Sequence, residues 1–79
     1  MADVIYTTTH CPGCDTLKSQ LAARPIEGLR VFNLDERPDL RPFFDATGAR
    51  AVPTAVIDGV AVTGTRAILD ALRAKYGRP

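Results

Sequence analysis

The feature that most restricts the fold is a pair of cysteines between a predicted strand and a predicted helix. Residues 4–8 (Val-Ile-Tyr-Thr-Thr) are β-branched or aromatic, which favours a buried strand. The segment Cys11-Pro12-Gly13-Cys14 begins three residues later. Proline suits the first position of a helix, because the N–H that it lacks is unpaired there in any case. We therefore expect a strand, a short turn and a helix with Cys11 at its tip.

The next segments predict a crossover and a second helix. Arg24-Pro25 should end the first helix, because a residue before proline disfavours the α region. Leu29 to Leu34 is predicted to form a second strand, which such a crossover makes parallel to the first. A second helix is expected between Pro38 and Thr47, with Pro42 in its first turn or at a kink. Its apolar residues at helical spacing are Leu40, Phe43, Phe44 and Thr47.

The last third of the chain predicts a hairpin and a final helix. Asp58-Gly59 separates two β-rich runs, which is a strong hairpin signal. The last helix should start near Thr65 as N-cap. Its predicted buried face consists of Ile68, Leu69, Leu72 and Tyr76. The order β-α-β-α-β-β-α predicts an α/β domain over residues 1–79 with a mixed four-stranded sheet.

Composition excludes several classes of protein. A chain of 79 residues buries a thin core, so a large substrate must be held on its surface. Ten basic against nine acidic residues leave a net charge of +1, without the basic footprint of a nucleic-acid binder. No apolar run approaches the roughly 20 residues of a membrane span, and we see no secretory signal. We expect a cytosolic protein that acts as a monomer.

The two cysteines predict redox chemistry. A thiolate, the reactive form of cysteine, is favoured at a helix N-terminus by the helix dipole and unpaired N–H groups. Cys11 is predicted at that position, and Cys14 lies one turn further along. Cys11 would form a mixed disulfide with a substrate, and Cys14 would resolve it.

Metal binding is the alternative interpretation of the same cysteines. A closed zinc site needs four ligands, and His10 is poorly placed to be a third. A soft-metal chaperone needs only two cysteines, but such domains run β-α-β-β-α-β. We therefore expect no bound metal and an exposed His10, which could assist thiolate formation near its own titration range.

Ala51-Val52-Pro53-Thr54 is a second informative motif, and it has two interpretations. Pro53 could simply open a strand, where proline is tolerated. Alternatively, the Val52-Pro53 peptide bond is cis in a tight turn beside the reactive cysteines.

Taken together, these motifs resemble the glutaredoxins and their relatives, the NrdH-type redoxins, over nearly the whole chain. The resemblance rests on residues 5–8, Cys11-Pro12-Gly13-Cys14, residues 47–53, Ile57-Asp58-Gly59 and Gly64. It implies a thioredoxin fold, disulfide reduction, and glutathione as a co-substrate with no tightly bound cofactor.

The resemblance also implies site residues. Pro53 would be cis and pack against the disulfide, and Val52 would offer its backbone to an extended substrate. Gly64 and Thr65 would meet a substrate carboxylate. Contacts with a protein partner would spread over Pro12, Gly13, Val52 and Gly64. Apart from the resemblance, Arg50 lies just before the Val52-Pro53 strand edge and Arg66 in the first turn of the last helix, so both would supply positive charge to the substrate groove, unless both are solvated surface residues.

Departures from the family pattern bear on the source of electrons. Many glutaredoxins have Tyr where Gly13 stands, Lys where Thr8 stands, and Gly where Thr63 stands. Thr63-Gly64-Thr65-Arg66 is loosely similar to the Ser-Gly-Phe-Arg of NrdH-type proteins, which take electrons from thioredoxin reductase and pass them to ribonucleotide reductase. We therefore expect a flavoprotein reductase, rather than glutathione, as the donor. An iron–sulfur cluster carrier is the alternative function, disfavoured by Pro12, where many cluster-binding relatives have Gly.

Overall fold

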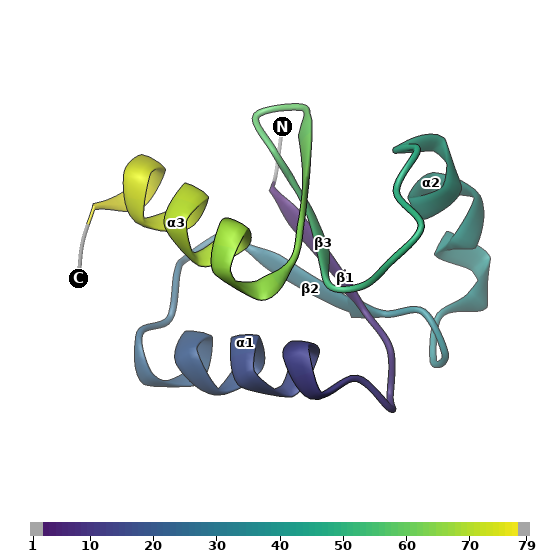
Figure 1. The fold of residues 1–79 in the computed structure, drawn as a ribbon, viewed down its shortest axis with the longest axis horizontal. Coiled ribbons are helices and arrows are strands. Elements are labelled where there is room, and N and C mark those ends of the chain that lie inside the picture. Colours follow the sequence, from purple (N-terminus) through teal and green to yellow (C-terminus); the bar gives the residue numbers. More distant parts are fainter. Residues whose placement is uncertain (1–2, 78–79) are drawn as a thin grey trace.

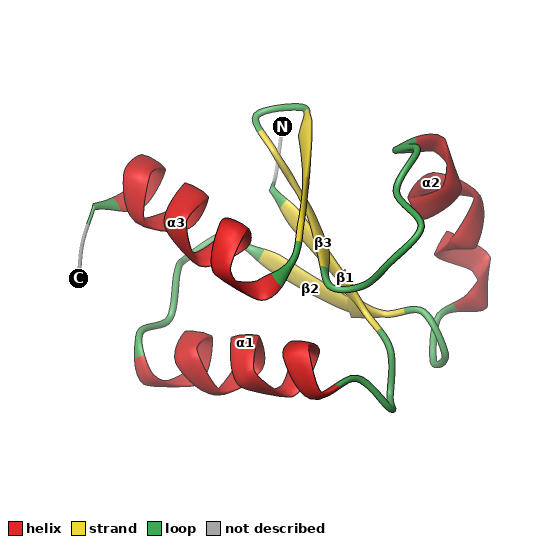
Figure 2. Ribbon diagram, viewed as in Figure 1, coloured by secondary structure: helices red, strands yellow, loops and turns green. Residues whose placement is uncertain are grey.

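A computed structural model describes residues 3–77 as one sheet flanked by helices (Figures 1 and 2). The elements are β1 Val4–Thr7, α1 Pro12–Ala23, β2 Arg30–Asn33, a 3₁₀ turn Pro38–Leu40, α2 Arg41–Ala46, β3 Thr54–Ile57, β4 Val60–Thr63 and α3 Thr65–Tyr76. This order confirms the predicted β-α-β-α-β-β-α arrangement. Within the described part of the chain, no helix is long and apolar enough to cross a membrane.

The sheet has the strand order β2-β1-β3-β4. β1 and β2 are parallel, as the crossover predicts, whereas β3 is antiparallel to both β1 and β4. The turn between β3 and β4 consists of Asp58 and Gly59, both with positive φ (53° and 79°), as a two-residue hairpin of the predicted kind requires. The result is the thioredoxin fold with a mixed four-stranded sheet.

Helices cover both faces of the sheet (Figure 1). Alternate residues of a strand point to opposite faces, so neighbours in β1 enter different cores. Ile5 packs with α1 and α3 in a cluster of Ile5, Leu17, Ala55, Ile57, Ile68 and Leu72. Tyr6 faces α2, and its ring meets that of Phe44 edge-on at 5.7 Å between centroids. Because α1 and α3 share one face, the start of α3 can reach the start of α1.

Three sequence-based expectations change in detail. Pro42 lies in the first turn of α2, one of its two expected places, but of the apolar residues at helical spacing Phe44 is buried while Phe43 is 63% exposed. The N-cap of α3 is Gly64 (φ 102°), and Thr65 is the first helical residue. Tyr76, expected on the buried face of α3, is 41% exposed.

Tyr76 instead takes part in a polar cluster that fixes the end of α3. The buried carboxylate of Asp3 accepts hydrogen bonds from Lys75 Nζ (2.6 Å), the Tyr76 hydroxyl and the backbone N–H of Asp58 (3.0 Å). These bonds, that of Lys75 first, lower the pKa of Asp3 to about 2. The cluster joins the start of β1, the hairpin turn and the last turn of α3.

Candidate active site

Cys11 caps the N-terminus of α1. Its backbone is extended (φ −140°, ψ 99°), and its Sγ accepts a hydrogen bond from the N–H of Cys14 at 3.1 Å. Sulfur thereby takes the place of the Ser, Thr or Asp oxygen that usually caps a helix. Pro12 occupies the first helical position, as predicted. The positive end of the helix dipole is therefore directed at Cys11 Sγ, where it favours a thiolate.

Cys11 and Cys14 form a disulfide, with their Cα atoms 5.1 Å apart. The two residues differ in exposure: Cys11 is 8% exposed and Cys14 is fully buried. Only the Cys11 side of the disulfide can be reached from outside the protein.

The segment 51–54 faces the disulfide. The Val52-Pro53 peptide bond is cis, in agreement with the second of the two interpretations of this motif. The carbonyl oxygen of Val52 lies 3.7 Å from Cys11 Sγ. Pro53 is buried, and its Cδ would lie 3.5 Å from a Cβ placed on Gly13. The structure therefore brings Cys11, Gly13, Val52 and Pro53 together.

The start of α3 is hydrogen-bonded to the cysteine segment, at Gly13, and to the segment 51–54, at Pro53. The N–H of Gly64 donates to the Pro53 carbonyl oxygen at 2.9 Å, and the Thr65 hydroxyl donates to the Gly13 carbonyl oxygen at 2.8 Å. Gly64 and Thr65 are thereby joined to Pro53 and Gly13, while their contact with a substrate carboxylate, which the resemblance implies, stays a prediction. The Thr65 hydroxyl, however, is used within the protein.

Sequence reasoning assigned no role to Thr54 and Thr63. The buried Thr54 hydroxyl donates to the Ala51 carbonyl oxygen at 2.6 Å and lies 2.8 Å from the Thr63 hydroxyl. The hairpin register pairs Thr54 with Thr63 directly. The sequence contained a signal for this pair, because a two-residue turn at Asp58-Gly59 fixes which residues of β3 and β4 lie opposite one another.

The two arginines assigned to the substrate groove are exposed. Arg66 has a side chain that is 93% exposed, with Nε 3.9 Å from an oxygen of Asp70. Arg50 lies two residues before Val52 and makes no ion pair within residues 3–77. His10 is exposed in the loop before α1, as expected. No group of three or more His, Cys, Asp or Glu side chains with metal-binding geometry occurs in the described residues.

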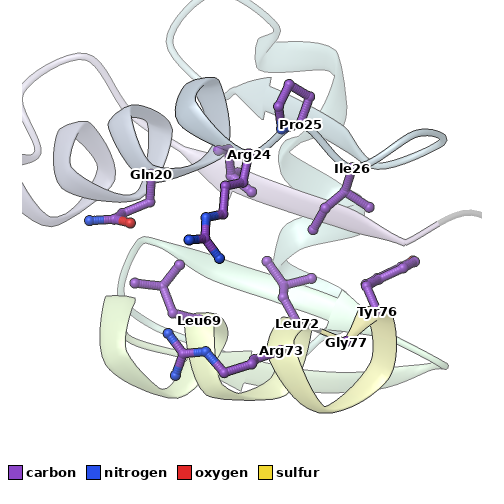
Figure 3. A pocket seen from close by; sticks show the side chains of 10 residues that line it. Gln20, Arg24, Pro25, Ile26, Leu69, Leu72, Arg73, Tyr76 and Gly77 are labelled. Atoms are coloured by element: carbon purple, nitrogen blue, oxygen red, sulfur yellow. The ribbon is translucent and has the colours of Figure 1, made fainter. Parts of the chain in front are cut away.

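A groove of about 610 Å³ lies at the far end of α1 from Cys11 (Figure 3). The groove is lined by apolar side chains of α1, of the loop that follows it and of α3 (Leu21, Pro25, Ile26, Leu69 and Leu72), and Arg24 extends from the end of α1 toward α3. Arg73 lines the same groove and has an ion pair with Asp70 at 3.4 Å. The lining of this groove includes none of Cys11, Gly13, Val52 and Pro53, so the candidate site is the surface around Cys11.

Comparisons with known proteins agree with this geometry. Residues 4–62 match the glutaredoxin family. The glutaredoxin-like protein NrdH-redoxin from Escherichia coli, which has a thioredoxin-like activity profile, superposes with a TM-score of 0.71 at 25% identity over 91% of this chain and 95% of that one. Oxidized glutaredoxin 2 from Chlamydomonas reinhardtii gives 0.61 at 26% identity (95% and 73% covered). A buckwheat glutaredoxin–glutathione complex gives 0.67 at 22% identity (95% and 71% covered), which bears on the fold alone. No curated protein matches the chain at a significant level.

Proposed function

The chain belongs to the glutaredoxin family, and from that premise we propose that it is a dithiol oxidoreductase that reduces protein or mixed disulfides. The observation that carries the proposal is the position of Cys11. Its sulfur caps α1, accepts the N–H of Cys14 and is the more exposed of the pair. These are the properties that a nucleophilic thiolate needs.

The order of steps in the reaction follows from the difference in exposure between Cys11 and Cys14. The Cys11 thiolate attacks one sulfur of the substrate disulfide, that S–S bond breaks, and the departing thiolate takes a proton from solvent. Cys14 then loses its proton and attacks Cys11 Sγ, which releases the second substrate thiolate. Two electrons pass from the dithiol to the substrate, and the Cys11–Cys14 disulfide remains. A reductant must then restore the dithiol.

Residues 12, 13, 52 and 53 would form the surface that receives the substrate. Val52 precedes β3, and its carbonyl oxygen lies 3.7 Å from Cys11 Sγ. An extended segment that pairs with the backbone of Val52 would therefore present its own disulfide to Cys11. Gly13 has no side chain, which lets the backbone of a partner come close.

Single cysteine variants test the proposal. Cys11→Ser should abolish the reduction of a disulfide substrate such as insulin. Cys14→Ser should accumulate a mixed disulfide with the substrate, visible as an added mass that disappears with dithiothreitol. If instead Cys14→Ser resists iodoacetamide at pH 6 while Cys11→Ser reacts, the two roles are reversed.

We further propose that the dithiol is restored by a flavoprotein reductase of the thioredoxin reductase type, in the cytosol. The likeness to NrdH-redoxin, a protein with a thioredoxin-like activity profile, supports this choice. Thr8 and Thr63 support it as well, since both stand where glutathione-using relatives have other residues. Ribonucleotide reductase is the substrate that this likeness suggests. Its turnover with NADPH, thioredoxin reductase and this protein would test that extension.

A further inference from the structure

Thr65 contacts the Cys11–Cys14 segment through a hydrogen bond that spans 52 positions of the sequence. Its hydroxyl donates to the carbonyl oxygen of Gly13 at 2.8 Å, and both residues are half-buried. The substrate role that sequence reasoning gave Thr65 does not account for this bond, because the hydroxyl is directed at the backbone of the protein itself.

The acceptor carbonyl belongs to the peptide unit that serves Cys11. The C=O of Gly13 and the N–H of Cys14 lie in one planar peptide group, so fixing one fixes the other. That N–H donates to Cys11 Sγ at 3.1 Å. A continuous path therefore runs from the Thr65 hydroxyl, through the Gly13–Cys14 peptide, to Cys11 Sγ.

We propose that Thr65 is a positioning residue for the nucleophile: its hydroxyl orients and polarises the Gly13–Cys14 peptide, whose N–H stabilises the Cys11 thiolate. Hydrogen bonds in a chain strengthen one another, because a donor on the carbonyl increases the polarity of the N–H in the same unit. The inference rests on the proposed function in one respect, namely that Cys11 acts as a thiolate.

The same contact explains the glycine at position 13. A Cβ placed there would lie 2.9 Å from Thr65 Oγ1, closer than ordinary packing allows. Gly13 is not among the glycines with positive φ, so space, and not backbone conformation, requires it. Glycine is a poor helix former, yet it stands at the second position of α1. A side chain at position 13 therefore requires Thr65 Oγ1 to move from its place beside the Gly13 carbonyl oxygen.

The test measures how readily Cys11 ionises. In the full chain carrying Cys14→Ser, Cys11 is the one remaining thiol, and the rate of its alkylation by iodoacetamide is measured against pH. The midpoint of that curve is the pH at which half of Cys11 is ionised. Thr65→Val keeps the shape of the side chain and removes the hydroxyl. From a 10–30% strengthening of the N–H bond to the Cys11 thiolate, taken as a hydrogen bond to a charged group, we expect the midpoint to rise by roughly 0.1–0.7 pH unit. Thr65→Ser, which keeps the hydroxyl, should restore the original midpoint.

Thr16 offers a matched control. Its exposed hydroxyl donates to the Pro12 carbonyl oxygen at 3.1 Å, in the neighbouring peptide, whose N–H belongs to Gly13 and not to Cys14. Thr16→Val should therefore leave the midpoint unchanged. An unchanged midpoint in Thr65→Val, an equal shift in Thr16→Val, or a failure of Thr65→Ser to restore the value would each overturn the proposal.

A second measurement covers the case in which Thr65→Val does not fold. Urea unfolding of Gly13→Ala is compared in the Thr65 and Thr65→Ala backgrounds. Alanine at 13 should destabilise the protein that retains Thr65 and be neutral or stabilising without it. An equal effect in both backgrounds contradicts the steric pairing. Neither measurement needs a disulfide substrate, so absence of reductase activity would refute the proposed function and leave this inference standing.

Discussion

The hydroxyl group of Thr54 lies 2.8 Å from that of Thr63, and this contact joins the segment around Pro53 to the strand that leads into α3. Thr54 has one hydroxyl proton, and it is directed to the Ala51 carbonyl oxygen at 2.6 Å. Thr63 must therefore be the donor between the two threonines. The buried Thr54 oxygen is therefore hydrogen-bonded both to Ala51, just before the Val52-Pro53 bond that faces Cys11, and to Thr63 at the end of β4.

This arrangement predicts unequal costs for the two valine substitutions. Thr54→Val removes both hydrogen bonds and leaves the Ala51 carbonyl without this donor, so it should lower the free energy of unfolding by about 1–3 kcal/mol. Thr63→Val removes one bond at an exposed residue and should cost about 1 kcal/mol or less. Urea unfolding of the oxidised proteins would measure both, with Thr63→Ser as the control. Equal midpoints for the two valine variants would contradict the assigned donors.

The Asp3 cluster predicts a dependence of stability on acidity. The pKa of Asp3 is lowered from 3.8 to about 2 in the folded protein, chiefly by the hydrogen bond from Lys75. A carboxylate with a lowered pKa stabilises the fold above its unfolded pKa, and the effect is lost as pH falls from about 4 to 2. Asp3→Asn should therefore cost about 2 kcal/mol at pH 7 and almost nothing at pH 2. A cost that is the same at both pH values would show that the charge of Asp3 is not what stabilises the fold.

Local sequence rules predicted most of the fold, because most of its elements are coded locally. The hairpin turn, the helix that opens at Pro12 and the parallel crossover all depend on neighbouring residues, and the structure confirms them. The cysteine pair was accessible for the same reason, whereas the cis bond before Pro53 was one of two local interpretations and was favoured by the family resemblance.

The errors have a common physical origin in contacts between distant segments. Threonine is a residue type that often caps helices, but Gly64 takes the N-cap position and the Thr65 hydroxyl donates to the Gly13 carbonyl oxygen. Tyr76 has the spacing of a core residue, but its hydroxyl bonds to Asp3, 73 positions away. Helical periodicity and capping preferences do not encode which remote carbonyl or carboxylate a hydroxyl will meet.

Charge reversal tests the two arginines assigned to the substrate groove. Arg50→Glu together with Arg66→Glu should raise KM for an acidic disulfide substrate and leave kcat little changed, because the contacts are made equally in the ground and transition states. Arg24→Glu with Arg73→Glu is a matched control, since it changes net charge equally, and Arg73, like Arg66, pairs with Asp70. An unchanged KM in the first variant, or an equal rise in the second, would indicate solvated surface arginines.

The choice of electron donor is tested at position 8. Glutathione is a small anion whose capture depends on a few charge-assisted contacts, each contributing roughly 1.5–3 kcal/mol. This chain has Thr8 where many glutathione-using relatives have Lys. One such contact is therefore absent, which corresponds to a loss of about tenfold or more in affinity. A protein partner spreads its contacts over a wider surface and does not depend on that one residue.

The oxidised protein should accordingly be reduced quickly by NADPH with thioredoxin reductase and slowly by millimolar glutathione with glutathione reductase. Thr8→Lys should raise the glutathione-dependent rate by about tenfold or more, because it restores the missing contact, and should leave the reductase-dependent rate nearly unchanged. Gln20→Lys adds the same charge at an exposed position near the other end of α1 and should change neither rate. Rapid reduction of the unmodified protein by glutathione, with none by thioredoxin reductase, would show that the donor is glutathione.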